Sequence, residues 1–279
     1  MIIDFHTHIF SDEIKNNRAV YLEKEPLFNE LYANPKAKLA NAEELIAEMI
    51  IQNVDMSVVQ NFQWLDSGLC HETNAYFGQV IAQHPGKLMG FGMCCLDNPQ
   101  RAIKEIEYCA RIGLKGIGEI RPKISLLTDI AKIKPVIECL QENHLILLTH
   151  ASEPAGHQYS GKGDITPETL YPFIVAFPDL KLVCAHWGGG LPFYNLMPEV
   201  KTALTNVYFD SAASPYLYSS GIYSQIDSLM GTDHCLFGSD YPLLKPQRLL
   251  RDLQSQNLPE AVKHKFLAGN AMSLLGLSA

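Results

Sequence analysis

The chain has 279 residues, of which 47% are hydrophobic and 19% are charged, and its formal net charge is −8. This composition excludes a disordered chain, because it can supply a large apolar core. The acidic balance and the lack of a Lys/Arg block argue against nucleic-acid binding through a basic face. No apolar run approaches the roughly 20 residues that span a membrane, so we expect neither nucleic acid nor a membrane as a partner.

The first residues are apolar and run directly into His6-Thr-His8, which predicts a strand that ends in two histidines. Side chains alternate along a strand, so His6 and His8 point to the same face and can hold one divalent ion. A long polar segment at about 9–40 follows, and its length predicts a loop that acts as a lid or binds a ligand. Asn41 and Glu44 then form a capping-box pattern at the start of a helix.

Beyond this helix, apolar stretches typical of strands alternate with helical segments as far as the C-terminus. The further expected strands are 56–61, 87–94, 114–120, 145–150, 181–186, 207–210 and 235–240. The expected helices are 41–52, 72–83, 99–111, 129–143, 167–177, 192–204, 219–230, 247–255 and 259–275.

Each expected strand is almost continuously hydrophobic, as parallel strands are when helices cover both faces of the sheet. Eight strand–helix units therefore predict an α/β fold, a (β/α)8 TIM barrel in a single domain over residues 1–279. A doubly wound open sheet is the alternative. It is less favoured because no Gly-x-Gly-x-x-Gly follows the first strand.

Polar side chains of metal-binding or acid/base type stand at the expected carboxyl ends of the strands. They are His6, His8, Glu119, His150, His186, Asp210 and Asp240. In a (β/α)8 barrel the catalytic groups gather at this end, whereas the opposite end serves stability. We therefore predict an active site on this rim.

Five of these residues, His6, His8, His150, His186 and Asp240, form a pattern that resembles the metal-dependent amidohydrolase superfamily. The finer resemblance is to the amidohydrolase 2 branch, which includes aminocarboxymuconate semialdehyde decarboxylase. It extends over the whole chain and is carried by Gly116-Ile-Gly-Glu-Ile120, His186-Trp-Gly-Gly-Gly190 and Phe237-Gly-Ser-Asp-Tyr-Pro242.

The resemblance implies that His6, His8, His150 and Asp240 are metal ligands. His186 is either a further ligand or an acid/base residue, and Glu119 either bridges a second ion or accepts a hydrogen bond near the first. One or two ions per chain are therefore expected. Imidazoles with a carboxylate favour Zn²⁺, with Mn²⁺ as the alternative.

We expect hydrolysis of an ester, lactone or amide-type bond in a small anionic substrate. Metal-activated water would be the nucleophile, and Asp240 and His186 would be the catalytic residues that move protons. The alternative is nonoxidative decarboxylation of a small carboxylic acid, in which His186 protonates or activates the reacting carbon. A metal-binding barrel without catalysis is a third interpretation.

The loops after the fourth and fifth strands carry Arg121, His157, Tyr159 and Lys162. Cationic side chains and a tyrosine facing a metal can hold an anionic small molecule, so these four are predicted to bind the substrate. The alternative is an ordinary solvated loop. Seven cysteines without a Cys-x-x-Cys pair, and an N-terminus without a signal-peptide layout, predict a reduced cytoplasmic protein. The resemblance also suggests a homodimer.

Overall fold

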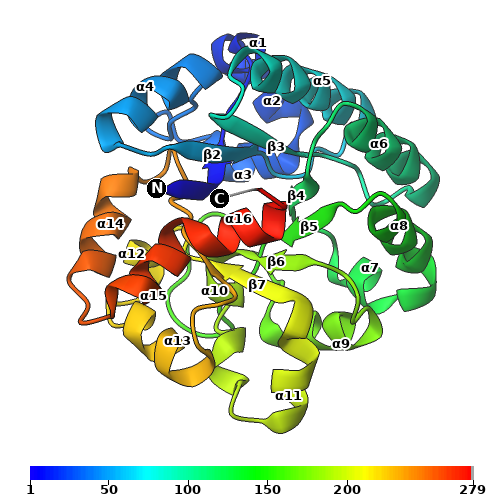
Figure 1. The fold of residues 1–279 in the computed structure, drawn as a ribbon. Helices are drawn as coiled ribbons and strands as arrows, with labels where there is room; N and C mark the ends of the chain where they lie inside the picture. Colours follow the sequence, from blue (N-terminus) through cyan, green and yellow to red (C-terminus); the bar gives the residue numbers. More distant parts are fainter. Residues whose placement is uncertain (278–279) are drawn as a thin grey trace.

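The computed structural model describes residues 1–277, so the last two residues of the expected domain lie outside the described range. Eight parallel strands pair in chain order around the molecule (Figure 1). They are β1 (Ile3–His8), β2 (Met56–Gln60), β3 (Leu88–Gly92), β4 (Gly116–Ile120), β5 (Ile146–Thr149), β6 (Leu182–Cys184), β7 (Val207–Asp210) and β8 (Cys235–Leu236). The backbone also joins the last strand to the first, because Phe5 N donates to Phe237 O at 2.7 Å. The predicted (β/α)8 barrel is therefore confirmed.

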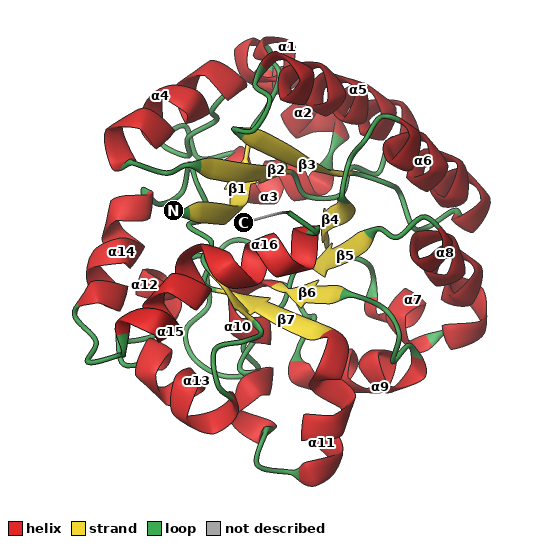
Figure 2. Cartoon of the chain, viewed as in Figure 1, coloured by secondary structure: helices red, strands yellow, loops and turns green. Residues whose placement is uncertain are grey.

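Helices such as α4, α5, α6, α8 and α14 surround the strands on the outside of the barrel (Figure 2). The helices of the described residues are α1 (Asp12–Asn16), α2 (Arg18–Lys24), α3 (Pro26–Tyr32), α4 (Ala42–Gln52), α5 (Ser67–Gln83), α6 (Pro99–Arg111), α7 (Ile124–Thr128), α8 (Ile130–Glu142), α9 (Pro167–Ala176), α10 (Ala185–Gly188), α11 (Pro198–Ala203), α12 (Ser214–Leu217), α13 (Ile222–Met230), α14 (Pro246–Gln254), α15 (Glu260–His264) and α16 (Asn270–Leu275), with the 3-10 helices η1 (Leu191–Tyr194) and η2 (Leu204–Asn206) and the π-helix η3 (Lys265–Gly269). Within residues 1–277, none of these helices has the length and apolar character needed to cross a membrane.

The barrel interior is closed at one end by the C-terminal helix. Phe5 of β1 and Phe91 of β3 meet edge to face inside the barrel, with ring centroids 5.5 Å apart. Ala271 and Leu274 of α16 belong to the same buried cluster, and Figure 1 shows α16 lying across this end of the barrel, close to the N-terminus. Because this end is filled with apolar side chains, the open end of the barrel is the opposite one, where the strands finish.

Segment 9–40, named here the β1 insert, differs from the predicted loop because it contains the three short helices α1, α2 and α3. Pro26 occupies the first turn of α3, where its missing N–H removes no helical hydrogen bond. Phe28 of this helix packs against Trp64 in the segment after β2, with ring centroids 5.5 Å apart. The buried carboxylate of Glu25 accepts hydrogen bonds from the backbone of the same segment. These contacts fasten the insert over the rim of the barrel.

Candidate active site

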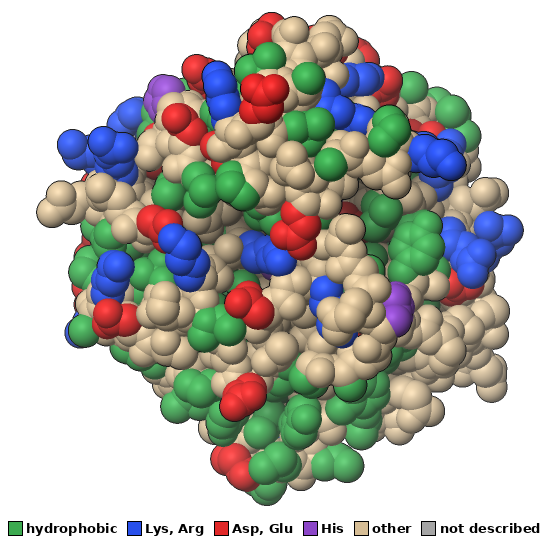
Figure 3. Space-filling view, turned by 180° about the vertical axis from the view of Figure 1, so that it is seen from behind, with side chains coloured by type: hydrophobic (Ala, Val, Ile, Leu, Met, Phe, Trp, Pro, Cys, Tyr) green, Lys and Arg blue, Asp and Glu red, His purple; other side chains and the backbone are tan. Residues whose placement is uncertain are grey.

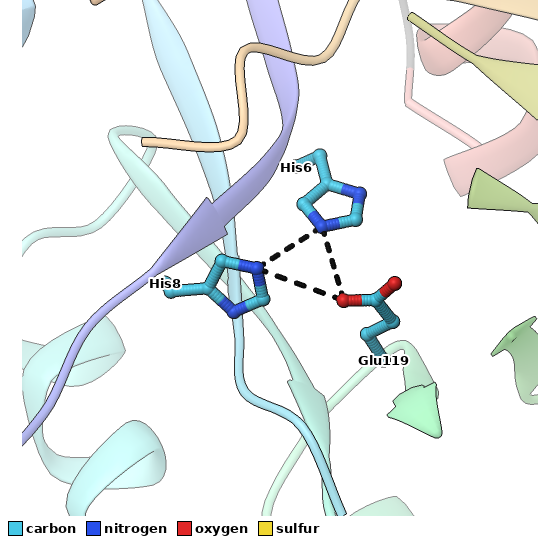
Figure 4. Close-up of side chains that lie close together, drawn as sticks. All are labelled: His6, His8 and Glu119. Carbon is cyan, nitrogen blue, oxygen red and sulfur yellow. Dashed lines mark hydrogen bonds and ion pairs between the residues drawn. The ribbon is translucent and has the colours of Figure 1, made fainter. Parts of the chain in front are cut away.

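Three predicted metal ligands meet at the carboxyl ends of β1 and β4. Nε2 of His6 lies 3.1 Å from Nε2 of His8. Oε2 of Glu119 lies 3.4 Å from the first of these nitrogens and 3.7 Å from the second. Figure 4 shows the three side chains pointing toward one another. Such a convergence of nitrogen and oxygen atoms can hold a metal ion.

Asp210, which ends β7, fixes the orientation of His6. Its Oδ2 lies 2.8 Å from Nδ1 of His6, and an ionised carboxylate can only accept a hydrogen bond. His6 therefore carries a proton on Nδ1, which leaves Nε2, the nitrogen that faces His8, as the one that can bind a metal ion once it is deprotonated. Two nitrogens bound at about 2.0–2.1 Å to one ion lie about 3 Å apart. The separation of the two imidazoles therefore fits a shared divalent metal.

The second oxygen of Glu119 faces another group of potential ligands. Its Oε1 lies 2.7 Å from Nδ1 of His150 and 3.3 Å from Nε2 of His186. Nδ1 of His186 lies 3.1 Å from the carbonyl oxygen of Ala212, so Nδ1 carries a proton and Nε2 is the nitrogen that can bind an ion once it is deprotonated. Glu119 thus joins two groups that could each hold an ion. The number of ions and each ligand's role remain predictions.

Asp240, which follows β8, completes the cluster of predicted ligands. Its Oδ1 lies 3.1 Å from Nε2 of His8. The backbone of Asp240 is left-handed, with φ of 67°, and that of His186 is too, with φ of 55°. Such conformations typically cost a non-glycine residue of order 1–3 kcal/mol and persist only where the surroundings enforce them. They also explain why β6 and β8 stop before these residues, which the sequence had placed within the strands.

Mutual charge shifts the pKa values of this cluster in the metal-free protein. Burial opposes the charged form of His6, but the carboxylates of Asp210 and Glu119 raise its pKa well above the usual range. Burial likewise opposes charge on His186, whose pKa is raised to about 9 by its hydrogen bond to Glu119 and by that carboxylate's charge. Burial favours the neutral form of Asp240, but its neighbouring histidines lower its pKa to about 2. A cation entering the cluster therefore meets ionised carboxylates and competes with protons for the histidines.

A cavity of about 400 Å³ opens above the cluster. Its walls are mostly apolar or aromatic and come from the β1 insert and from the loops after β2, β7 and β8. These wall residues are Leu27, Leu31, Tyr32, Phe62, Tyr216, Leu217, Pro242 and Leu243. Figure 3 shows the face of the molecule opposite to that in Figure 1, where acidic and basic side chains are interspersed among hydrophobic ones. A mostly apolar cavity with a small number of polar groups is the usual form of a small-molecule site.

Three of the four predicted substrate contacts, Arg121, His157 and Tyr159, line this cavity. Lys162 is not among the lining residues. It is buried, and its Nζ donates to two carbonyl oxygens of its own loop at 3.0 Å each. The role predicted for Lys162 in substrate binding stays a prediction, and in this structure its ammonium group is bonded to the loop. The sequence could not reveal in which direction this side chain turns.

Three further residues of the site had no role assigned from the sequence. Asp210 was visible as a strand end, but its contact with His6 joins positions 204 residues apart. Tyr32 lines the cavity, and burial together with the charge of Asp240 raises the pKa of its hydroxyl. Glu30 lies 3.3 Å from the guanidinium of Arg121. Both Tyr32 and Glu30 lie on α3, and nothing local in that sequence indicates that the helix covers the rim.

The model of a protein family described as amidohydrolase matches residues 3–277. This chain belongs to the amidohydrolase family. The predicted resemblance is thereby confirmed, and the protein is an enzyme of the amidohydrolase superfamily.

Two curated proteins are similar to this amidohydrolase in sequence. The 2-amino-3-carboxymuconate-6-semialdehyde decarboxylase of Dictyostelium discoideum is 23% identical over 248 residues, which is 75% of this chain and 67% of the relative. The gamma-resorcylate decarboxylase of a Polaromonas species is 23% identical over 277 residues, which is 83% of this chain and 84% of the relative.

Solved structures with a similar fold include two 5-carboxyvanillate decarboxylases. The enzyme from Sphingomonas paucimobilis has a TM-score of 0.80 and 19% identity, with 99% of each chain covered. The enzyme from Novosphingobium aromaticivorans, complexed with manganese, has a TM-score of 0.79 and 18% identity, with 99% of this chain and 96% of that chain covered. At these identities the likeness concerns the fold.

These comparisons contradict the predicted hydrolysis, because the named relatives are mainly decarboxylases. The prediction was wrong for a physical reason. Histidines and carboxylates that hold a divalent ion serve both water activation and carboxylate binding, so the ligand pattern alone does not select the reaction. The pattern of ligands indicated the family but did not indicate the reaction.

Proposed function

We propose that this amidohydrolase is a metal-dependent nonoxidative decarboxylase of a small, planar carboxylic acid. The observation that carries the proposal is the composition of the cavity, whose walls are mostly apolar or aromatic and whose lining includes the predicted metal ligands His8, Glu119, His150, His186 and Asp240. A substrate carboxylate would be drawn to this metal-binding end, while the apolar body would pack against Leu31 and Phe62. The decarboxylase names of the relatives support the same choice.

The reaction breaks one carbon–carbon bond and involves no oxidation. The carboxylate leaves as CO₂, the electron pair stays on the substrate carbon, and a proton is added there. A bound divalent ion would supply positive charge that orients the carboxylate and stabilises the developing carbanion. An apolar cavity also favours the loss of CO₂, because it solvates the charged carboxylate of the substrate poorly and CO₂ is neutral.

His186 is the residue proposed to handle the proton. The hydrogen bond between its Nδ1 and the carbonyl oxygen of Ala212 fixes the ring, so only Nε2 can exchange a proton with a bound molecule. Asp210 supports this position, because its Oδ1 accepts a hydrogen bond from the backbone N–H of His186 at 3.0 Å. Asp240 would remain ionised beside His8 and complete the ligand set.

The ion is proposed to be Zn²⁺ or Mn²⁺. Imidazole nitrogens suit zinc well, and carboxylate oxygens with water suit manganese. The presence of manganese in a similar structure supports including it. A small molecule as the substrate agrees with the volume of the cavity, whereas the expected homodimer remains a prediction that a mass measurement in solution would test.

The test is a turnover assay on protein reconstituted with each metal in turn. Aromatic monocarboxylic acids with and without ring hydroxyl groups are offered, and CO₂ release and the decarboxylated product are measured. Work in D₂O should place one deuterium on the carbon that lost the carboxylate. His186→Asn should lower kcat by about 10²–10⁴-fold, and His264→Asn, an exposed change on α15, should not. Hydrolysis of esters or lactones without CO₂ release would reject the proposal, and binding without turnover would favour a non-catalytic barrel.

A further inference from the structure

One charged residue of the cavity wall is already paired within the protein. Arg121 follows β4 directly and lines the cavity. Both Nη1 and Nη2 of its guanidinium lie 3.3 Å from the carboxylate of Glu30, on α3 of the β1 insert. The Arg121 side chain is only 17% exposed and that of Glu30 is 41% exposed. The charge of the guanidinium that lines the cavity is therefore balanced by Glu30, which lies behind it and is not itself a lining residue.

The loop after β5 holds this pair in place. The backbone N–H of Gly161 donates to Oε1 of Glu30 at 2.9 Å. Gly163 packs against the guanidinium so closely that an added Cβ would lie 2.7 Å from Nε of Arg121. The Glu30 carboxylate thus receives hydrogen bonds from a side chain and from the backbone. A substrate carboxylate that approached Arg121 would have to displace Glu30 from these hydrogen bonds or share the guanidinium with it.

The Arg121–Glu30 pair affects which groups of a bound molecule can lie next to Arg121 in the cavity. A second carboxylate placed near Arg121 would lie beside the like charge of Glu30, or would displace Glu30 and leave it without partners. Either outcome is unfavourable, and such a penalty discriminates between ligands as effectively as an added attraction does. An uncharged ring edge meets no such penalty. Lys38 also lines the cavity and is exposed, so water screens its charge; the charge of Glu30, whose side chain is 41% exposed, is screened in part.

We propose that Glu30 is a specificity-determining residue that restricts the substrate to a single carboxylate, by neutralising Arg121 and repelling a second carboxylate. This inference rests on the proposed decarboxylase function and adds the charge class of its substrate. The single carboxylate would occupy the metal-binding end, and the part of the substrate that faces Arg121 would be uncharged.

The test compares the binding of benzoate and isophthalate, which differ by one carboxylate, to Mn²⁺-loaded protein by calorimetry. Wild-type protein should bind benzoate more tightly. Glu30→Gln keeps an acceptor for the N–H of Gly161 but removes the charge. It should shift the benzoate-to-isophthalate affinity ratio by about two- to fivefold toward isophthalate, the scale of one partly exposed ion pair. Benzoate affinity should stay within about twofold of wild type, since an uncharged ring edge gains nothing from the freed cation.

Two further variants make the result specific. Glu23→Gln removes the same charge from an exposed position on α2 and should leave the ratio unchanged. Arg121→Gln leaves Glu30 without its cation, so isophthalate should bind still more weakly than to wild-type protein. This measurement can be made even if Glu30→Gln does not fold. An unchanged ratio in Glu30→Gln, an equal shift in Glu23→Gln, or no binding of either acid would overturn the inference. A shifted ratio without CO₂ release in any turnover assay would reject the decarboxylase and leave the charge selectivity standing.

Discussion

Replacing Asp210 with Asn should weaken metal binding, although Asp210 is not itself a proposed ligand. Its Oδ1 accepts the backbone N–H groups of His186 and Ala212 at 3.0 Å each, and its Oδ2 faces Nδ1 of His6 at 2.8 Å. An asparagine that keeps its oxygen on the two backbone donors must turn its NH₂ group toward His6. Because NH₂ only donates, the His6 proton moves from Nδ1 to Nε2, and Nε2 then loses the lone pair that would bind the ion.

The size of the effect follows from the role of Asp210. Outer partners of metal-binding histidines typically contribute about 10–100-fold in metal affinity, which corresponds to about 1.4–2.7 kcal/mol. The alternative rotamer, with NH₂ on the two backbone N–H groups, creates two donor–donor contacts and is worse. We therefore expect the dissociation constant for Zn²⁺ or Mn²⁺ to rise by at least about tenfold.

The assay is competition with a chromophoric chelator at fixed pH and ionic strength. Asp233→Asn is the control, since Asp233 is exposed and pairs with Lys265 at the surface, so it loses the same charge without touching the site. Thermal unfolding of the metal-free proteins separates a structural effect from a ligand effect. If Asp210→Asn unfolds at a lower temperature but binds metal within about threefold of wild type, the tautomer argument fails.

Other predictions follow from the same contacts. Glu119→Gln should weaken metal binding at both ligand groups, because one oxygen faces each; metal content per chain during a titration measures this, and an unchanged stoichiometry and affinity would contradict it. Lys162→Met should lower the unfolding temperature with little change in KM, whereas His157→Ala, which alters the cavity wall, should raise KM; steady-state kinetics separates the two. Metal uptake at pH 7 should release protons, because the pKa values of His6 and His186 are raised in the metal-free protein. Metal affinity should therefore fall as the pH is lowered from about 9; calorimetry in buffers of different ionisation enthalpy measures the release, and none at pH 7 would refute it.

The sequence alone determined the barrel and the rim on which its chemistry lies. Strands and helices are encoded locally by hydrophobic period and by caps such as Asn41, which forms the predicted capping box with Glu44. Once eight strands alternate with helices, the topology places every carboxyl end on one rim. That rule alone brought His6 and Asp240 together, although they lie at opposite ends of the chain. Strand ends were less well predicted, because the left-handed backbone at Asp240 follows from the site and not from local propensity.

Only the tertiary structure decided how side chains at that rim are turned and paired. The contact between Asp210 and His6 spans 204 residues, and that between Glu30 and Arg121 spans 91. Lys162 was expected in the cavity and instead bonds to its own loop. Neither the partner nor the direction of a side chain is set by the spacing of residues along the chain. Both depend on how the β1 insert and the strand loops pack together, because a carboxylate can neutralise a cation or orient a histidine only where packing brings the two within hydrogen-bond distance.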